Sequence, residues 1–255
     1  MIETYFKRKV LALQDFTQLT ANAFLNAFSA PRYYTDTVAQ MDAIGVGSLS
    51  IVLLTGFFTG AILALQTYRT LQNFGEVSLM GEAVAVSLVR ELGPVFTAIV
   101  VAGRNSSGIA SEIGSMLVSE QIDALRALGA DPSRKLVTPR LYATLTMLPL
   151  LTILSDFIGM VGGYLVSFSV AKLTTAEYWT MAYQSLTFHD VAQGLVKPFF
   201  FGAIIALVGC YFGLHTEGGT QGVGRSTTQA VVVASVLIIL VDFFIGRFLI
   251  GIHFA

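Results

Sequence analysis

Five long apolar stretches constrain the fold of this chain more than any other feature. They cover about residues 44–66, 83–113, 137–170, 191–214 and 226–250. About 20 consecutive apolar residues are enough for a helix to cross the hydrocarbon core of a bilayer, and each stretch reaches that length. The sequence therefore predicts an all-α, polytopic membrane protein with five transmembrane helices.

The composition agrees with this class and excludes several others. The chain is 54% apolar and 12% charged, with a mean hydropathy of +0.71, whereas a soluble domain carries about 25% charged residues. A net charge of -1 argues against nucleic acid as a partner. The single cysteine, Cys210, excludes an intrachain disulfide, and the three histidines are scattered along the sequence. We therefore expect no metal site and no cofactor.

The N-terminal residues 2–29 are predicted to form an amphipathic helix that lies in the membrane interface. Gln14 and Asp15 interrupt the apolar run that a signal peptide needs. The apolar residues instead recur at helical spacing, namely Phe6, Val10, Leu13, Phe16 and Leu19, followed by Phe24 and Phe28. An alternative is a helix that packs on the bundle. This division gives an N-terminal interfacial helix and elbow over residues 1–43, and a transmembrane domain over residues 44–255.

A polar segment, Ser119–Pro132, separates the second and third apolar stretches. It is predicted to be a short helix over about residues 119–129, capped by Ser119 and ended by Gly129. Its apolar residues Ile122, Leu125 and Leu128 are spaced to share one face. Because so short a helix is not stable alone, it must dock on something. It is either a connector or an element that transmits force from a separate protein.

The distribution of basic residues predicts the orientation in the membrane. One side holds most of them: Lys7, Arg8, Lys9, Arg32, Arg126, Arg134, Lys135, Arg140 and Arg225. The positive-inside rule assigns that side to the cytoplasm. The N-terminus and the polar segment then face the cytoplasm, and the C-terminus faces outward.

Several charged residues interrupt the apolar stretches. At 1.5 Å per residue, Arg90, Asp156 and Asp242 lie about 31, 28 and 24 Å from the cytoplasmic ends of their spans. Lys197 and Arg247 fall in the same band. We therefore expect Arg90, Glu91, Asp156 and Asp242 to share one depth near the outer interface. They form either a polar collar at the mouth of a cavity or a set of interface anchors.

Glycine and proline positions give further local expectations. Gly56 and Gly60 form a small-xxx-small pair that favours close helix packing. Proline removes a backbone donor, so a bend is expected at Gly93-Pro94, and Pro139 and Pro149 are expected to break the third stretch. The Gly-rich residues 217–225 are predicted to be a cytoplasmic loop. Part of that loop resembles a phosphate-binding loop but lacks its lysine and preceding strand, so we expect no ATP binding.

One ordered set of motifs resembles a known family. The motifs are Arg90-Glu91-Leu92-Gly93-Pro94, Ala102-Gly103-Arg104, Ala110-Ser111-Glu112-Ile113-Gly114-Ser115-Met116, Ser119-Glu120-Gln121-Ile122-Asp123-Ala124-Leu125, Ala130-Asp131-Pro132 and Thr138-Pro139-Arg140. A further match is Gly222-Val223-Gly224 followed by Thr227-Thr228. Together they resemble the MlaE (YrbE) family of ABC-transporter permeases, and the resemblance covers nearly the whole chain from about residue 44.

The resemblance implies a complex in the bacterial inner membrane. Permeases of this family are non-catalytic and work as dimers with two cytoplasmic ABC ATPase subunits. An MCE-domain periplasmic lipid-binding protein, and in many cases a STAS-domain protein, complete the complex. The cargo is phospholipid moved between the inner and outer membranes, a process tied to outer-membrane lipid asymmetry and solvent tolerance.

The resemblance also assigns roles to residues of this chain. The polar segment becomes the coupling helix, and its predicted ATPase contacts are Glu120, Ile122, Asp123, Leu125, Arg126 and Leu128. The predicted cargo contacts in a central cavity are Leu63, Leu71, Phe74, Arg90, Glu91 and Leu92. An arginine is suited to a lipid phosphate. The alternative is that Arg90 and Glu91 pair with other helices, through Asp156 or Lys197.

Two other function classes were weighed against the permease. A secondary transporter more often shows an internal repeat and broken midplane helices, and no repeat is visible in the sequence. A membrane-embedded lipid-modifying enzyme needs polar catalytic groups within reach of each other, and the sequence holds neither a histidine pair nor a metal motif.

Overall fold

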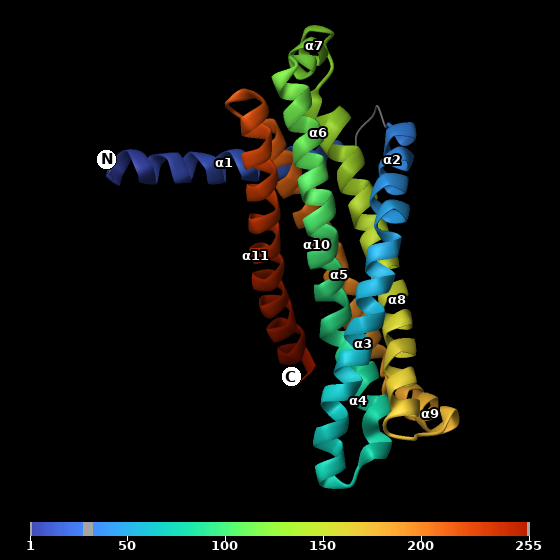
Figure 1. Ribbon diagram of the computed structural model, residues 1–255. Coiled ribbons are helices and arrows are strands. Elements are labelled where there is room, and N and C mark those ends of the chain that lie inside the picture. The colour runs from blue at the N-terminus through green and yellow to red at the C-terminus, as the bar shows by residue number, and fades with distance from the viewer. Residues whose placement is uncertain (1, 28–32, 254–255) are drawn as a thin grey trace.

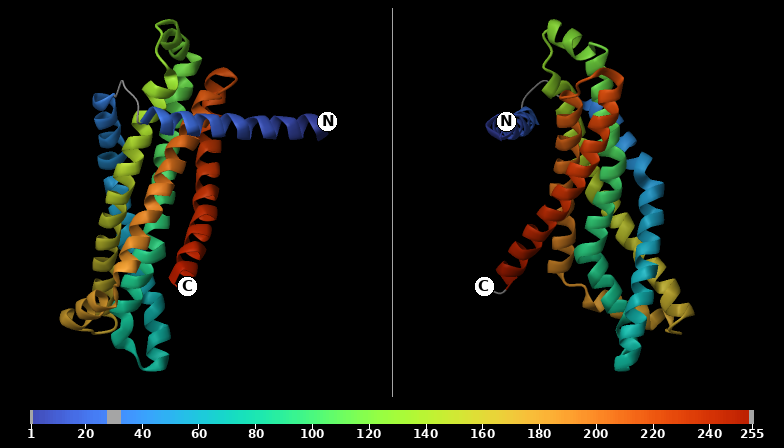
Figure 2. Two further views of the ribbon diagram at one scale, coloured as in Figure 1. Left: turned by 180° about the vertical axis from the view of Figure 1, so that it is seen from behind. Right: turned by 60° about the vertical axis from the view of Figure 1, so that its left-hand side comes forward.

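The computed structural model describes residues 2–27 and 33–253, and within these ranges the regular structure is entirely helical (Figure 1). Five helices are long and apolar enough to cross a membrane: Tyr34–Phe74, Val77–Val118, Ser133–Ser169, Phe188–Leu214 and Gly219–Phe248. They run side by side as one elongated bundle (Figures 1 and 2). The predicted all-α class and the number of spans are confirmed.

The first span is much longer than the predicted residues 44–66. It consists of α2 (Tyr34–Met41), the π-helical turn η1 (Asp42–Val46) and α3 (Gly47–Phe74), which follow one another without leaving the right-handed helical region. Gly75 ends it in the left-handed region, at φ 75°. This conformation lets the N–H of Glu76 donate to the Leu71 carbonyl at 3.1 Å.

The second span is interrupted by two π-helical turns. It begins with η2 (Val77–Leu79) and α4 (Met80–Ser87), and continues through η3 (Leu88–Leu92), α5 (Gly93–Val101), η4 (Ala102–Ser106) and α6 (Ser107–Val118). At Gly93-Pro94, where a bend was expected, the structure has the π-helical turn η3 directly before Gly93. Such wide turns are frequent at functional sites, and η3 carries Arg90 and Glu91.

The third span follows the short helix α7 (Gln121–Ala127) and consists of η5 (Ser133–Val137) and α8 (Thr138–Ser169). Pro139 is the second residue of α8 and follows the π-helical turn η5, and the helix continues through it. Pro149 lies inside α8 and does not end the helix, so the break predicted at Pro149 is wrong.

A helix that was not predicted, α9 (Thr175–Ser185), connects the third and fourth spans. A capping box starts it: Thr174 and Glu177 satisfy each other's backbone N–H groups. The backbone N–H and the hydroxyl of Thr174 both donate to the Glu177 carboxylate, which lowers the pKa of that carboxyl. The span α10 (Phe188–Leu214) starts with a second capping box, from Thr187 and Asp190.

The predicted Gly-rich loop 217–225 is mostly wrong. The last helix, α11, covers Gly219–His253 and so begins seven residues before the expected start at Ser226. The turn between α10 and α11 is confined to residues 215–218, and Gly218 and Gly219, at φ 89° and 65°, take the left-handed conformation at its end. The later glycines of the segment are therefore free to be helical, because the chain has already reversed its direction.

The N-terminal helix α1 (Ile2–Ala27) lies crosswise to the long helices, near the end of the bundle that carries α7 (Figures 1 and 2). Its second half packs on the bundle, where Leu19 and Ala23 are buried and the Phe16 ring meets Tyr211 edge-on at 5.5 Å. Its first half projects away and exposes Val10, Leu11 and Leu13. α1 thus packs on the bundle and also offers the apolar surface expected of an interfacial helix. Phe28 lies outside the described residues.

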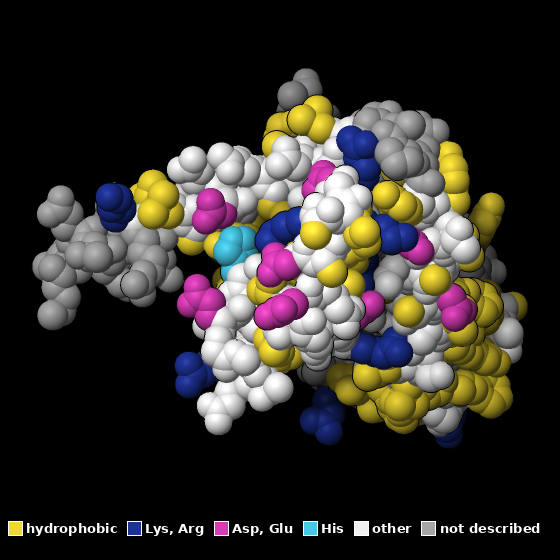
Figure 3. Space-filling view, turned by 90° about the horizontal axis from the view of Figure 1, so that it is seen from above, with side chains coloured by type: hydrophobic (Ala, Val, Ile, Leu, Met, Phe, Trp, Pro, Cys, Tyr) yellow, Lys and Arg dark blue, Asp and Glu magenta, His cyan; other side chains and the backbone are white. Residues whose placement is uncertain are grey.

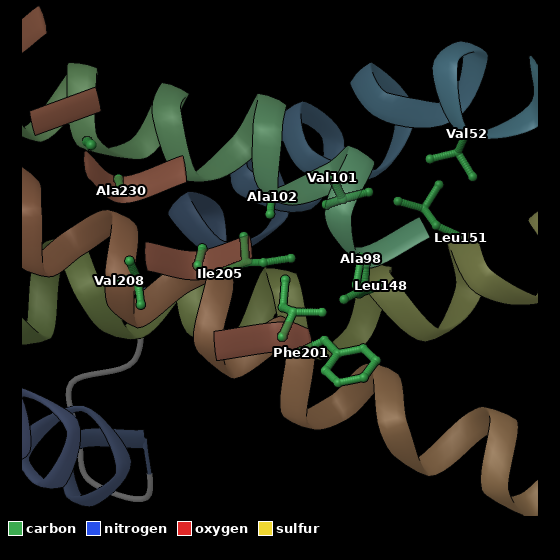
Figure 4. Packing of buried hydrophobic residues seen from close by; sticks show 13 residues of the cluster. Val52, Ala98, Val101, Ala102, Leu148, Leu151, Phe201, Ile205, Val208 and Ala230 are labelled. Carbon is green, nitrogen blue, oxygen red and sulfur yellow. The ribbon is translucent and has the colours of Figure 1, made fainter. Parts of the chain in front are cut away.

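The largest core cluster joins the first, second, third, fourth and fifth spans (Figure 4). Small residues permit close packing beside it. A Cβ atom on Gly60 of α3 would lie 1.9 Å from the Gly159 carbonyl oxygen of α8, and one on Gly56 would lie 2.6 Å from Ser155 Oγ. The predicted close packing at Gly56 and Gly60 is therefore confirmed, and it occurs inside the chain between α3 and α8.

The close α3–α8 contact predicts that adding one methyl group at Gly60 lowers the stability of the protein. Gly60→Ala should destabilise the protein by about 1–3 kcal/mol, because the two backbones must separate to admit the new Cβ atom. Thermal unfolding of the detergent-purified protein measures this. Gly224→Ala is the matched control, since no atom lies within 4 Å of its added Cβ. Equal melting temperatures for the two variants would contradict the packing described here.

Candidate functional site

A buried lysine organises the charges inside the bundle. Lys197 of α10 is fully buried and forms ion pairs with Glu91 of η3 and, at 2.9 Å, with Asp242 of α11. Gln193, one turn before Lys197, donates to the other Glu91 oxygen at 3.2 Å. Burying a charge is costly unless it is paired. These contacts therefore fix the second, fourth and fifth spans to one another.

Arg90 and Asp156, which lie close to these ion pairs, have different environments. Arg90 pairs with Asp190 at the start of α10, at 2.7 Å. The carboxyl of Asp156 lies against Gly93, where a Cβ atom would come within 1.6 Å of Asp156 Oδ1. The alternative that Arg90 and Glu91 pair with other helices is borne out. Glu91 pairs with the suggested Lys197, whereas the partner of Arg90 is Asp190 at the N-terminus of α10 and neither Asp156 nor Lys197.

These contacts confirm that the inner charges share one level. Glu91 and Asp242 meet on the same lysine. Arg90 is the residue before Glu91, and Asp156 faces Gly93, which is three residues, or about 4.5 Å of helix, from Arg90. We name Glu91, Gln193, Lys197 and Asp242 the charge cluster.

A hollow of about 510 Å³ opens beside the charge cluster. It is lined by Glu91, Ile239, Asp242, Phe243, Gly246 and Arg247. Five of these residues belong to α11, which the sequence analysis had not linked to cargo. The inner charges Asp242 and Arg247 were visible in the sequence, but their approach to Glu91 depends on how the fifth span packs. Gly246 leaves room there, with the Glu91 carboxylate 3.7 Å from its would-be Cβ atom.

The six predicted cargo residues do not form one surface in this chain. Arg90 and Glu91 belong to the charged level. Leu63, Leu71 and Leu92 are partly buried in a separate apolar cluster around Met80 and Leu88 of the second span. Phe74, at the end of α3, is 75% exposed.

At the opposite end of the bundle, the helix α7 differs in detail from the prediction. Ser119 does not cap it: its hydroxyl donates to the Ser115 carbonyl at 2.8 Å, and the N-cap is Glu120, at φ 60°. Ser119 instead ends α6, because the chain turns one residue later. The predicted stop at Gly129 is confirmed, with φ 75° and an N–H of Ala130 bonded to the Leu125 carbonyl.

The three apolar residues of α7 point in different directions. Ile122 is fully buried in a cluster with residues of α1, α6, η5, α8 and α10, and Leu125 packs at the edge of that cluster. Leu128 is 83% exposed. Glu120, Asp123 and Arg126 are also exposed, and the last two form an ion pair at 2.9 Å. Only part of the predicted ATPase-contact face is therefore available on the chain surface.

Viewed along the bundle from the α7 end, acidic and basic side chains surround small apolar areas (Figure 3). An inward-facing arginine lies below this surface. Arg140 of α8 has a 4% exposed side chain, pairs with Glu112 of α6 at 2.6 Å and donates to the Leu136 carbonyl at 2.8 Å. The helices before and after α7 are thus joined to each other as well as to α7.

Comparison with known proteins agrees with this architecture. The family model described as Permease MlaE matches residues 37–248. The chain belongs to the MlaE permease family. Among its relatives, a probable ABC transporter permease protein of Rickettsia typhi is 41% identical over 227 residues, which are 89% of this chain and 88% of the relative. The predicted family is confirmed.

Two further relatives carry more specific names. The intermembrane phospholipid transport system permease protein MlaE of Haemophilus influenzae is 35% identical over 221 residues, 86% of this chain and 85% of the relative. The chloroplastic protein TRIGALACTOSYLDIACYLGLYCEROL 1 of Arabidopsis thaliana is 40% identical over 216 residues, 85% of this chain and 62% of the relative. These matches favour neither a secondary transporter nor a lipid-modifying enzyme.

The charge cluster predicts a strong effect of neutralising its lysine. Lys197→Met should destabilise the MlaE-family chain by about 3 kcal/mol, because it leaves Glu91 and Asp242 close together without a cation. Thermal unfolding in detergent measures the loss. The variant Lys197→Met with Glu91→Gln and Asp242→Asn removes all three charges and should recover most of the stability. A single variant as stable as the wild type would contradict the role given to Lys197.

Proposed function

We propose that this chain is the non-catalytic permease subunit of an ABC transporter that moves phospholipid between the inner and outer membranes of a bacterium. The family match over nearly the whole chain and the printed name of the Haemophilus relative support the cargo and the transporter class. The structural observation that carries the proposal is α7, a short helix anchored in the chain by Ile122 and exposing Leu128 at the end of the bundle.

The proposed ATPase contact uses the outward part of α7. Leu128 enters an apolar groove on the ATPase, the edge of Leu125 lies at its border, and Glu120, Asp123 and Arg126 form the polar rim. The buried Ile122 instead holds α7 to the permease. Closure of two ATPase subunits around ATP then moves α7 together with α6 and α8, because these elements share one packed cluster.

The proposed cargo entrance is the hollow at the charged level. Arg90 has a 41% exposed side chain although it is paired with Asp190, so its guanidinium is accessible to a lipid phosphate. Glu91 lines the hollow and is held by Lys197. Ile239 and Phe243 of α11 supply apolar wall. In the complex, Leu63, Leu71, Phe74 and Leu92 would extend this wall.

A second copy of the chain would cover a polar face of the first two spans. Gly47, Ser50, Gly103 and Arg104 are exposed inside candidate spans. The Arg104 guanidinium donates to Ser48 Oγ at 2.9 Å and still reaches the surface. An arginine facing lipid chains is costly, and small residues let helices approach closely. Both properties suit a homodimer contact near a polar cavity.

The remaining partners follow from the orientation. The basic end that carries α7 faces the cytoplasm and meets the ATPase, with which a STAS-domain protein associates. The end with α9 and the start of α10 faces the periplasm, where an MCE-domain lipid-binding protein receives or delivers cargo. The N-terminus is then cytoplasmic and the C-terminus is on the periplasmic side.

The ATPase contact is tested by a charge on α7. Leu128→Glu should release the ATPase from the purified complex and abolish ATP-dependent phospholipid movement, while the melting temperature of the permease stays unchanged. Leu128 suits this test better than Leu125, since Leu125 also packs within the chain. Tyr183→Glu, on the exposed face of α9, is the control and should retain the ATPase. Wild-type transport by Leu128→Glu would rule out the proposed docking.

The cargo entrance is tested by removing the accessible guanidinium. Arg90→Gln should lower the rate of phospholipid transport about tenfold, which corresponds to the loss of about 1.4 kcal/mol of interaction with the headgroup phosphate. Transport into labelled acceptor vesicles is measured beside the melting temperature. Arg69→Gln, at the exposed end of α3, is the matched control. Equal transport rates for the two variants would contradict a cargo contact at Arg90 and would limit its role to the ion pair with Asp190.

A further inference from the structure

The segment that leaves α7, Asp131–Lys135, contacts two elements about one hundred residues earlier in the chain. Asn26, near the end of α1, donates to Asp131 at 3.4 Å and accepts from Arg134 at 3.2 Å. Asp36, in the first turn of α2, pairs with Lys135. These contacts join the exit of α7 to elements that precede the first span.

Lys135 makes the closest of these links. Its ammonium group pairs with the Asp36 carboxylate and lies over the Tyr33 ring, 4.3 Å from the ring centroid. The two interactions reinforce each other, because a cation is attracted both by a carboxylate and by the face of an aromatic ring. Tyr33 and Asp36 are three residues apart, about one helical turn, so Lys135 contacts one face of α2 at its N-terminus.

The helix that Lys135 binds lies at the surface of the bundle, alongside α8. None of the residues of α2 is fully buried. Yet α2 continues through η1 into α3 as one helical rod from Tyr34 to Phe74, 41 residues or about 60 Å long. The far part of this rod carries Leu63, Leu71 and Phe74. A shift of its cytoplasmic end is therefore carried to the level of the proposed cargo wall.

We propose that Lys135 is a positioning residue for transport: its contacts with Asp36 and Tyr33 couple movement of α7 to the first span. This inference rests on the proposed function, since it assumes that an ATPase moves α7. Two routes then lead from α7 through the membrane. One is covalent, through α6 and α8. The other passes from Lys135 to α2, at the start of the first span.

The solvent exposure of the Lys135–Asp36 ion pair distinguishes a role in coupling from a role in folding stability. The side chains of Lys135 and Asp36 are 34% and 39% exposed. Ion pairs this accessible to solvent contribute little to folding stability. Loss of the pair should consequently leave the amount of folded protein, its melting temperature and its bound ATPase unchanged, and alter only how efficiently ATP hydrolysis drives transport.

The test measures the number of phospholipid molecules moved per ATP hydrolysed by the complete reconstituted complex. Lys135→Gln should lower this ratio at least fivefold, with ATPase binding retained and ATP hydrolysis within twofold of the wild type. Lys135→Arg keeps the charge and the ring contact and should keep the ratio. The exchange Lys135→Asp with Asp36→Lys should restore at least half of it. An unchanged ratio in Lys135→Gln, or release of the ATPase, overturns the inference.

A covalent link provides an independent test. The double variant Asp36→Cys with Lys135→Cys should be poorly coupled, and a short thiol-reactive cross-linker should restore the ratio by joining the two segments again. The natural Cys210 is fully buried and does not compete for the reagent. If cross-linking leaves coupling low or stops transport, Lys135 does not act as proposed. Failure of Leu128→Glu to release the ATPase, in contrast, bears on the proposed function itself.

Discussion

The fully buried ammonium group of Lys197 is the interaction on which the arrangement of the spans depends most. It is placed in an apolar bundle and is compensated by carboxylates from two other spans, Glu91 of η3 and Asp242 of α11. Removing the lysine leaves the Glu91 and Asp242 carboxylates close together without a cation. The cluster consequently fixes where α11 passes the second span, and that passage forms the hollow beside Arg247.

In the proposed transporter, the two ends of the bundle have different roles. At one end, the hollow lies beside the charge cluster and is lined by Glu91, Asp242 and Arg247. At the other, Ile122 fixes α7 in a cluster that also contains residues of α1, α6, η5, α8 and α10. Long helices connect the two ends, and the proposed coupling uses them to carry a displacement at α7 toward the hollow. π-helical turns interrupt the first and second spans and begin the third, and each of them contains charged residues.

The sequence predicted the spans, the level of the inner charges and the Gly56–Gly60 packing, because hydropathy, helical rise and side-chain size determine these features locally. It did not predict α9, because this short amphipathic helix lies between two spans and has no long apolar run of its own. It also did not predict the early start of α11, where Gly218 and Gly219 end the turn and the later glycines are helical. The pairing of Arg90 with Asp190 and the burial of Ile122 depend on which helices become neighbours. That information is tertiary, and the spacing of residues along one helix does not contain it.

The most direct test of this account is the movement of labelled phospholipid by the wild-type permease, reconstituted in liposomes with the ATPase and the MCE-domain protein that we propose as its partners. The account predicts movement that requires ATP and stops when the ATPase is omitted or its hydrolysis is blocked. Movement at the same rate without ATP, driven by an ion gradient, would contradict it and would make the chain a secondary transporter.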